Sequence, residues 1–360
     1  MKKRKITFLF VILCMALIPV IYSSLFLGAL MDPYGKVSKL PVAVVSTTNN
    51  PVQSAIHSQS LFDSKVETPQ QAQNALKNGK VYAIIEFDKD FNQDLTHYPL
   101  TKKHPEVKLI TSEGLGYTTT KILKNTMFAF ITKMNQSIYQ QYLQSSKINS
   151  IQPLDPEVLQ LKNIETHAVP NNGTAMAPYI FSLTLFVGGI FVSQFVMRVF
   201  SRKNLSLKKY WLIEFGIPLL IGMIQAILLF VIGSSLLKIH MDQPLAVIPF
   251  FVLVSASFTS IIVGLNKLIP GIGSLLVLLI TMLQTSSSGG TYAIQLSGSF
   301  FQTINSYLPM TYSINGFKKL ISLNNLNVSS DVAVLLAFLL IGQLVLFWAY
   351  RKNERRIQEV

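Results

Sequence analysis

Residues 167–200 read HAVPNNGTAMAPYIFSLTLFVGGIFVSQFVMRVF, and they divide the chain into two parts. The first part of this stretch is polar and rich in Gly and Asn, as in a chain leaving a water-soluble domain. Residues 178–197 carry no charge, and at ~1.5 Å per residue they are long enough to cross a hydrocarbon core of about 30 Å. Pro178 suits the first turn of a helix, where its missing N–H needs no partner. We therefore predict that the chain enters the membrane here.

Composition places the whole chain among membrane proteins. Of its 360 residues, 50% are hydrophobic and 13% are charged, whereas a soluble domain carries about 25% charged residues. The formal net charge of +14 could suggest nucleic-acid binding. However, residues 32–175 are nearly balanced in charge. Most basic residues outside residues 32–175 flank the apolar stretches on one predicted side of the membrane. This is the positive-inside pattern of a cell-membrane protein with both termini in the cytoplasm, so no nucleic-acid partner is expected.

Six apolar stretches predict a six-helix transmembrane bundle. Residues 6–30 follow a basic tetrapeptide and lack a small-x-small cleavage site, so we interpret residues 1–31 as an uncleaved N-terminal anchor helix and not as a signal peptide. Residues 176–360 then form a five-helix transmembrane domain. The predicted spans are residues 6–30, 178–197, 211–237, 245–266, 268–284 and 332–350.

Residues 32–175 are predicted to form a small α/β domain outside the cell, inserted between helices one and two. Apolar, β-branched runs at residues 40–46, 80–87 and 106–111 predict buried strands. Thr68 as an N-cap and Gly79 as a stop signal predict a short helix between the first two. Strands alternating with helices favour an α/β fold. The helical pattern of residues 117–146 predicts a long stalk helix.

The segment at residues 286–331 is too long and too apolar for a plain outer loop. Apolar residues recur at helical spacing on either side of Pro309. Two short amphipathic helices broken at this proline fit a re-entrant or interfacial hairpin. We expect Lys318 and Lys319 to lie at the lipid headgroups.

Four stretches together resemble a known family. They are DPYG with LPVAVV, TPQQAQNALKNGKVYAIIEF, VPNNGTAMAPYIFSLTLFVGG, and SSGGTYAIQLSGSFFQTINSYLPMTYSINGFKKLI. Their order and spacing resemble the YhgE/Pip (phage infection protein) group of ABC type-2 membrane proteins. The resemblance implies a type-2 ABC permease with six helices per subunit, two subunits per pore and a separate cytoplasmic ATPase. The chain departs from the family at residues 46–50, STTNN, where members commonly have an acidic turn. The chain is also too short to hold the long helical insert of many members.

The sequence contains no motif that would make the chain an enzyme. ATP hydrolysis by a P-loop needs GxxxxGK[ST], and the Gly-Lys pairs at residues 35–36 and 79–80 lack the rest of this motif. The five histidines are scattered without HExxH spacing, and the spans offer no catalytic constellation. We therefore predict no catalytic, cofactor-binding or metal-binding residues and no cofactor. Any ATPase must be a partner subunit.

Two sets of residues are candidates for function. The loop after the second span could dock on the ATPase, or its charges could simply obey the positive-inside rule. Glutamines within apolar spans should face other helices or a water-filled substrate path, because a buried amide needs a partner. Glu214, one turn into its span, should either snorkel to the inner surface or pair there with Lys208 or Lys209. The loop residues are Arg198, Arg202, Lys203, Lys208 and Lys209, and the glutamines are Gln194, Gln225, Gln284 and Gln343.

These observations predict the membrane permease subunit of an ABC type-2 exporter. It would act as a homodimer or with a related permease subunit, move a hydrophobic or amphipathic substrate outward, and depend on an ATPase in trans. The alternative is a non-transporting envelope receptor or secretion-complex scaffold that displays the extracellular domain. Phage adsorption, which the family name suggests, would exploit that domain under either hypothesis.

Overall fold

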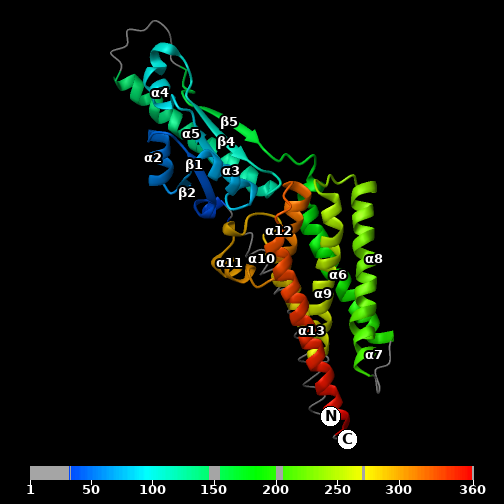
Figure 1. Ribbon diagram of the computed structural model, residues 1–360. Helices are drawn as coiled ribbons and strands as arrows, with labels where there is room; N and C mark the ends of the chain where they lie inside the picture. The colour runs from blue at the N-terminus through cyan, green and yellow to red at the C-terminus, as the bar shows by residue number, and fades with distance from the viewer. Residues whose placement is uncertain (1–31, 33, 146–154, 200–205, 270–271, 359–360) are drawn as a thin grey trace.

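The computed structural model describes residues 32, 34–145, 155–199, 206–269 and 272–358, so the predicted anchor helix lies outside the described residues. A domain built on a β-sheet lies at one end of a unit of long helices, and α13 (Ser329–Gln358) runs to the other end (Figure 1). We call residues 34–165 the sheet domain and residues 172–358 the helical unit.

The sheet domain contains a five-stranded sheet in the order β2-β1-β3-β4-β5. β1 pairs in parallel with β2 and β3, β3 pairs antiparallel with β4, and β4 pairs in parallel with β5. The predicted strands β1, β3 and β4 are confirmed, whereas the edge strands β2 and β5 were missed because both are polar. The bounds are β1 (Pro41–Val45), β2 (Asp63–Val66), β3 (Ala83–Phe87), β4 (Glu106–Thr111) and β5 (Gln160–Glu165).

Both faces of the central strands are buried, which explains their continuous apolar runs. In β1, Val42 and Val44 join one core cluster while Ala43 and Val45 join another, as the two-residue period of a strand requires. The first cluster contains side chains of α2 (Pro51–Ser58), α4 (Phe91–Thr101) and α5 (Tyr117–Ser145), and the second contains those of α3 (Pro69–Lys77). Thr68 caps α3, as predicted, and the structure adds a capping box with Gln71.

The helix that we predicted to be a stalk instead covers the sheet. Ile122, Met127, Phe130 and Ile138 of α5 belong to the same core cluster as the strands, and α5 lies along the sheet (Figure 1). The chain returns through β5 before it reaches the helical unit. The sheet domain therefore holds its longest helix within its own core.

Among the described residues of the helical unit, four helices are long and apolar enough to cross a membrane. They span residues Gly173–Val199, Leu207–Leu236, Pro244–Leu268 and Ser329–Lys352. The second comprises α7, a π-helical turn η2, α8 and a second π-helical turn η3. The elements are α6 (Asn172–Val199), α7 (Leu207–Trp211), η2 (Leu212–Gly216), α8 (Ile217–Val231), η3 (Ile232–Leu236), α9 (Pro244–Leu268) and α13.

Two predicted spans differ from the structure. α6 begins at Asn172, where the Asn171 side chain accepts a hydrogen bond from the Thr174 N–H at 2.8 Å, so Pro178 lies inside the helix. α10 (Gly273–Ser287) has 15 residues, about 22 Å of helix and less than a hydrocarbon core. The predicted span began at Leu268 because residues 268–272 carry no charge, whereas α9 ends at Leu268 and α10 begins at Gly273. Six crossings therefore remain a prediction.

α9 is the central helix of the helical unit. It is the most buried of the four long helices, and α6, α8, α10, α12 (Pro309–Ser322) and α13 all contact it. Small residues bring α9 and α13 together: a Cβ added at Gly342 would lie 2.5 Å from the Ser260 carbonyl carbon. The Ser257 and Ser260 hydroxyls donate to the Leu335 and Leu339 carbonyls at 2.9 and 2.8 Å. Such contacts are how helices associate where no hydrophobic effect drives them.

The segment at residues 286–331 joins the two parts of the molecule. It forms η4 (Ile294–Leu296), α11 (Ser299–Asn305) and α12, with the break at Pro309 as predicted. Tyr292 and Leu296 belong to the core of the sheet domain, whereas Ile314 and Phe317 belong to the core of the helical unit. Lys318 and Lys319, which we expect at the lipid headgroups, both contact protein groups, as detailed below. This segment therefore fastens the sheet domain to the helices.

We predict that Gly342→Ala destabilises the protein. The new methyl group would overlap the backbone of Ser260, and such overpacking typically costs ~1–3 kcal/mol. Thermal unfolding in detergent should show a Tm lower by several degrees. Gly189→Ala is the matched control, because the nearest atom is the flexible Ile262 Cδ1 at 3.0 Å. An equal Tm for both variants would contradict this packing.

Candidate functional site

Polar side chains gather at the C-terminal end of α9, in the half of the helical unit that lies away from the sheet domain (Figure 1). Ser260, Asn266 and Lys267 each contact a different neighbouring helix. We call these three residues and their partners the α9 polar cluster. Buried polar groups in an apolar bundle must find partners within the protein, so the cluster fixes how these helices meet.

Lys267 and Glu214 form a buried ion pair. Lys267 Nζ lies 2.8 Å from Glu214 Oε1, and their side chains are 9% and 1% exposed. Lys267 stands in the last turn of α9, although the predicted spans 245–266 and 268–284 left it between two helices. It takes the place of Lys208 and Lys209 as the partner of Glu214. Each charge therefore compensates the other, and either charge alone would be costly to bury.

A π-helical turn positions Glu214. η2 covers residues Leu212–Gly216, and Pro218 follows within the first turn of α8. Proline has no N–H to give to the carbonyl of residue 214, and its ring crowds that carbonyl, so the helix widens locally. Short π-helical turns of this kind are frequent at functional sites.

Asn266 links α9 to α6 and α10. Its Nδ2 donates to Ser193 Oγ at 3.0 Å, and its Oδ1 accepts from Ser274 Oγ at 3.1 Å. The predicted candidate Gln194 joins this network, since its Nε2 donates to Ser274 Oγ at 2.6 Å. Gln194 therefore links α6 to α10.

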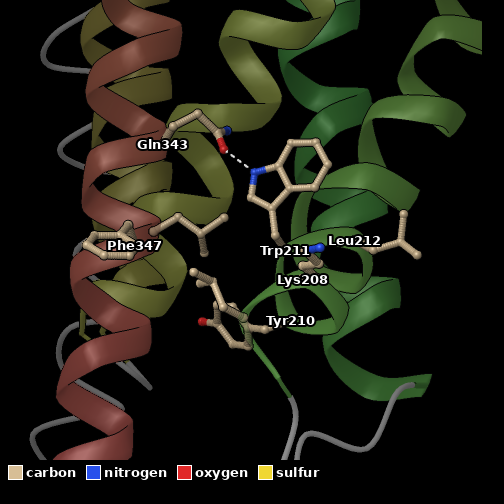
Figure 2. Close-up of a pocket in the computed structure, with 8 residues that line it drawn as sticks. Lys208, Tyr210, Trp211, Leu212, Gln343 and Phe347 are labelled. Atoms are coloured by element: carbon tan, nitrogen blue, oxygen red, sulfur yellow. Dashed lines mark hydrogen bonds between the residues drawn. The ribbon is translucent and has the colours of Figure 1, made fainter.

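Gln343 links α9 and α13 to the start of the second span. Its Nε2 donates to Ser260 Oγ at 2.8 Å, and its Oε1 accepts from the Trp211 indole N–H at 2.7 Å. Figure 2 shows this bond across a pocket of about 470 Å³ between α7 and α13. The pocket is mostly apolar, with Tyr210, Leu212 and Phe347 in its wall and Lys208 at its edge.

The other predicted residues lie apart from the cluster or at its margin. Arg198, Lys208 and Lys209 are exposed at the same end of the helical unit, while Arg202 and Lys203 lie outside the described residues. Gln225 faces Gly188, where an added Cβ would lie 2.8 Å from its Oε1. Gln284 is fully buried, and its Oε1 accepts from the Met310 N–H at 3.1 Å near the start of α12.

Sequence reasoning missed Ser260, Asn266 and Lys267. Ser260 is an ordinary residue of apolar helices, and Asn266 and Lys267 stood at the border between a predicted span and a predicted loop. The signal that could have found Asn266 and Lys267 is the Pro-Gly pair at residues 270–271 of the sequence. A proline one to three residues beyond a helix end puts both residues inside the last turn.

Comparison with known proteins identifies the family. A model of the ABC-2 family transporter proteins matches residues 5–350. The chain belongs to this family. It is also similar to the uncharacterized protein YhgE of Bacillus subtilis (strain 168), with 32% identity over 165 residues. That match covers 46% of this chain and 21% of the relative. No solved structure matches the chain.

The family confirms the resemblance inferred from the sequence and places the chain in a membrane. ABC-2 permeases are typically non-enzymatic membrane components that associate with an ATPase subunit. The exposed lysines of α7 and the α9 polar cluster behind them thus become a candidate site for coupling to that subunit.

We predict that Glu214→Gln strongly destabilises the helical unit. It leaves the Lys267 ammonium buried without its carboxylate, and breaking one side of a buried pair costs ~3–5 kcal/mol. The double variant Glu214→Gln/Lys267→Met should recover much of this loss, and thermal unfolding of the four cycle members measures it. Glu157→Gln, at an exposed position, is the control. Unchanged Tm in Glu214→Gln would show that the pair contributes nothing.

Proposed function

We propose that this chain is the permease subunit of an ABC type-2 exporter. A partner ATPase on the cytoplasmic side would supply the energy, and a hydrophobic or amphipathic substrate would move outward. The observation that carries the proposal is the family match over residues 5–350. It is supported by the exposed Lys208 and Lys209, which lie just before Glu214, the partner of Lys267 in the α9 polar cluster.

The arrangement around α7 supports a coupling role for residues 198–209. α7 leads without interruption into η2, which holds Glu214 against Lys267 of α9. Trp211, at the end of α7, holds Gln343 of α13. A displacement of α7 by a docked partner would therefore act at once on α9 and on α13.

The membrane orientation is part of the proposal. Basic residues gather at the α7 end of the helical unit, which favours the cytoplasmic side, so the sheet domain would lie outside. The exposed faces of α8 and α13 support a dimer in the membrane: Leu220 and Ile224 on α8, and Leu340 and Leu344 on α13, are large and exposed. Such faces suit lipid or a second subunit, and a substrate path could form between two copies.

Charge reversal of the α7 lysines tests the coupling site. We expect Lys208→Glu/Lys209→Glu to reduce co-purification with the cognate ATPase by at least tenfold, because acidic side chains would repel the partner surface that accepts two lysines. Pull-down of the tagged full chain, with the ATPase expressed from the same cells, measures this. Expression and Tm of the variant should match those of the natural protein, since both side chains are exposed.

The matched control is Arg351→Glu/Lys352→Glu, which reverses two exposed charges at the same end of the unit but on α13. Loss of association in the α7 variant alone supports docking at α7. An equal loss of ATPase association in both variants would show that the effect depends on the overall charge at this end of the protein and not on docking at α7. Absence of any ATPase in pull-downs of the natural protein would favour the receptor or scaffold alternative.

A further inference from the structure

A second pocket lies where the sheet domain meets the helical unit. Its volume is about 360 Å³, within the ~300–1,000 Å³ range of small-molecule sites. Tyr82 and Asn78 line it from the sheet domain, and Lys318, Lys319 and Asp331 line it from α12 and α13. Unlike the pocket beside α7, its wall is predominantly polar.

The charges in this pocket do not balance. Lys319 Nζ lies 2.6 Å from Asp331 Oδ2, so these two charges compensate each other. Lys318 Nζ instead donates to the Gly289 carbonyl at 3.1 Å. Among the described residues, no carboxylate forms an ion pair with Lys318. One positive charge is therefore left over in the pocket.

The environment of Lys318 makes that charge costly. Burial lowers the pKa of the Lys318 ammonium to about 8, because removal from water penalises the charged form. At pH 7 the group is still protonated, and a bound anion would offset the lost hydration. Tyr82 lines the pocket from the sheet domain and stays neutral, because burial raises the pKa of its hydroxyl to about 12.

Two further polar atoms in the wall lack partners among the described residues. The Ser288 hydroxyl has no hydrogen bond although the residue is only 3% exposed, and Gln295 Oε1 has none either. Buried polar atoms in native proteins nearly always have a partner. The hydroxyl of Ser288 can donate to an anion beside Lys318, and Gln295 Oε1 can accept from a hydroxyl of the same ligand.

The pocket lies at one end of the candidate membrane spans. Ser330 and Asp331, in its wall, belong to the first turn of α13, whose candidate span begins at Ser329. Since a span ends where hydrocarbon gives way to headgroups, the pocket lies at the level of the lipid headgroups or just above it.

We propose that this pocket binds a phosphoryl oxyanion carried by a small polyhydroxyl group, with Lys318 and Ser288 as the donors to the phosphate. The surplus ammonium, the free hydroxyl and the room beside them suit a glycerophosphate group better than a bare carboxylate. That group could belong to an anionic phospholipid or to a water-soluble glycerophosphate. The inference requires a membrane protein but not ATP-driven transport.

Binding to the full-length protein in an uncharged detergent at pH 7 tests the proposal. The probes are glycerol 3-phosphate, short-chain phosphatidylglycerol, and sodium acetate as the carboxylate arm, each followed by calorimetric titration. Saturable binding of glycerol 3-phosphate identifies a soluble source, and binding of phosphatidylglycerol alone identifies a headgroup; both support the site. We expect Lys318→Met to weaken binding at least tenfold and Lys318→Arg to retain most of it.

Two controls keep the test sharp. Lys89→Met removes an exposed lysine of the sheet domain and should leave binding unchanged. Ser288→Ala removes a hydroxyl that has no partner in the protein, so it should weaken binding severalfold without lowering Tm, even if Lys318→Met fails to fold. No saturable binding of either phosphate probe, acetate binding as tight as glycerol 3-phosphate, or binding indifferent to Ser288→Ala would overturn the proposal.

Discussion

The helical unit depends on one constraint: polar groups within an apolar bundle must be partnered inside the protein. α9 shows how the chain meets it. Ser257 and Ser260 donate to carbonyls of α13, Asn266 bonds to α6 and α10, and Lys267 pairs with Glu214 of the second span. Every one of these contacts is directional, so each fixes both the position and the rotation of a neighbouring helix. The hydrophobic surface holds the helices in the bilayer, while these contacts decide how they pack.

This arrangement connects the two ends of the molecule through few elements. At one end, α7 and η2 hold α9 and α13 through Glu214 and Trp211. At the other end, α13 begins at the pocket shared with the sheet domain, where Asp331 meets Lys319 of α12. α13 is therefore one continuous helix that contributes residues to both candidate sites.

The sequence was sufficient for features that depend on local chemistry. The apolar runs of β1, β3 and β4, the Thr68 cap and the break at Pro309 follow from residue type and spacing, and the structure confirms them. It was not sufficient where a tertiary partner decides. The polar edge strand β5 exists because β4 offers an open edge, and α5 covers the sheet because its apolar stripe finds the core there.

The same distinction separates the candidate sites. A glutamine in an apolar span predicts that its amide has a hydrogen-bond partner. It does not predict whether that partner is Ser274, Trp211 or a substrate. The sequence places Lys318 at the headgroups because charge next to an apolar helix usually faces water, but it does not reveal the contact with the Gly289 carbonyl, 29 positions away. Pairings across such distances are properties of the fold and not of any local pattern.

In the proposed orientation, the sheet domain and α7 lie on opposite sides of the membrane. Cysteine labelling in whole cells tests it most directly, starting from a Cys14→Ala background because Cys14 is the single cysteine of the chain. A membrane-impermeant maleimide should label Lys89→Cys in intact cells and Lys208→Cys only after permeabilisation. Labelling of Lys208→Cys in intact cells with protection of Lys89→Cys would invert the orientation and contradict the account.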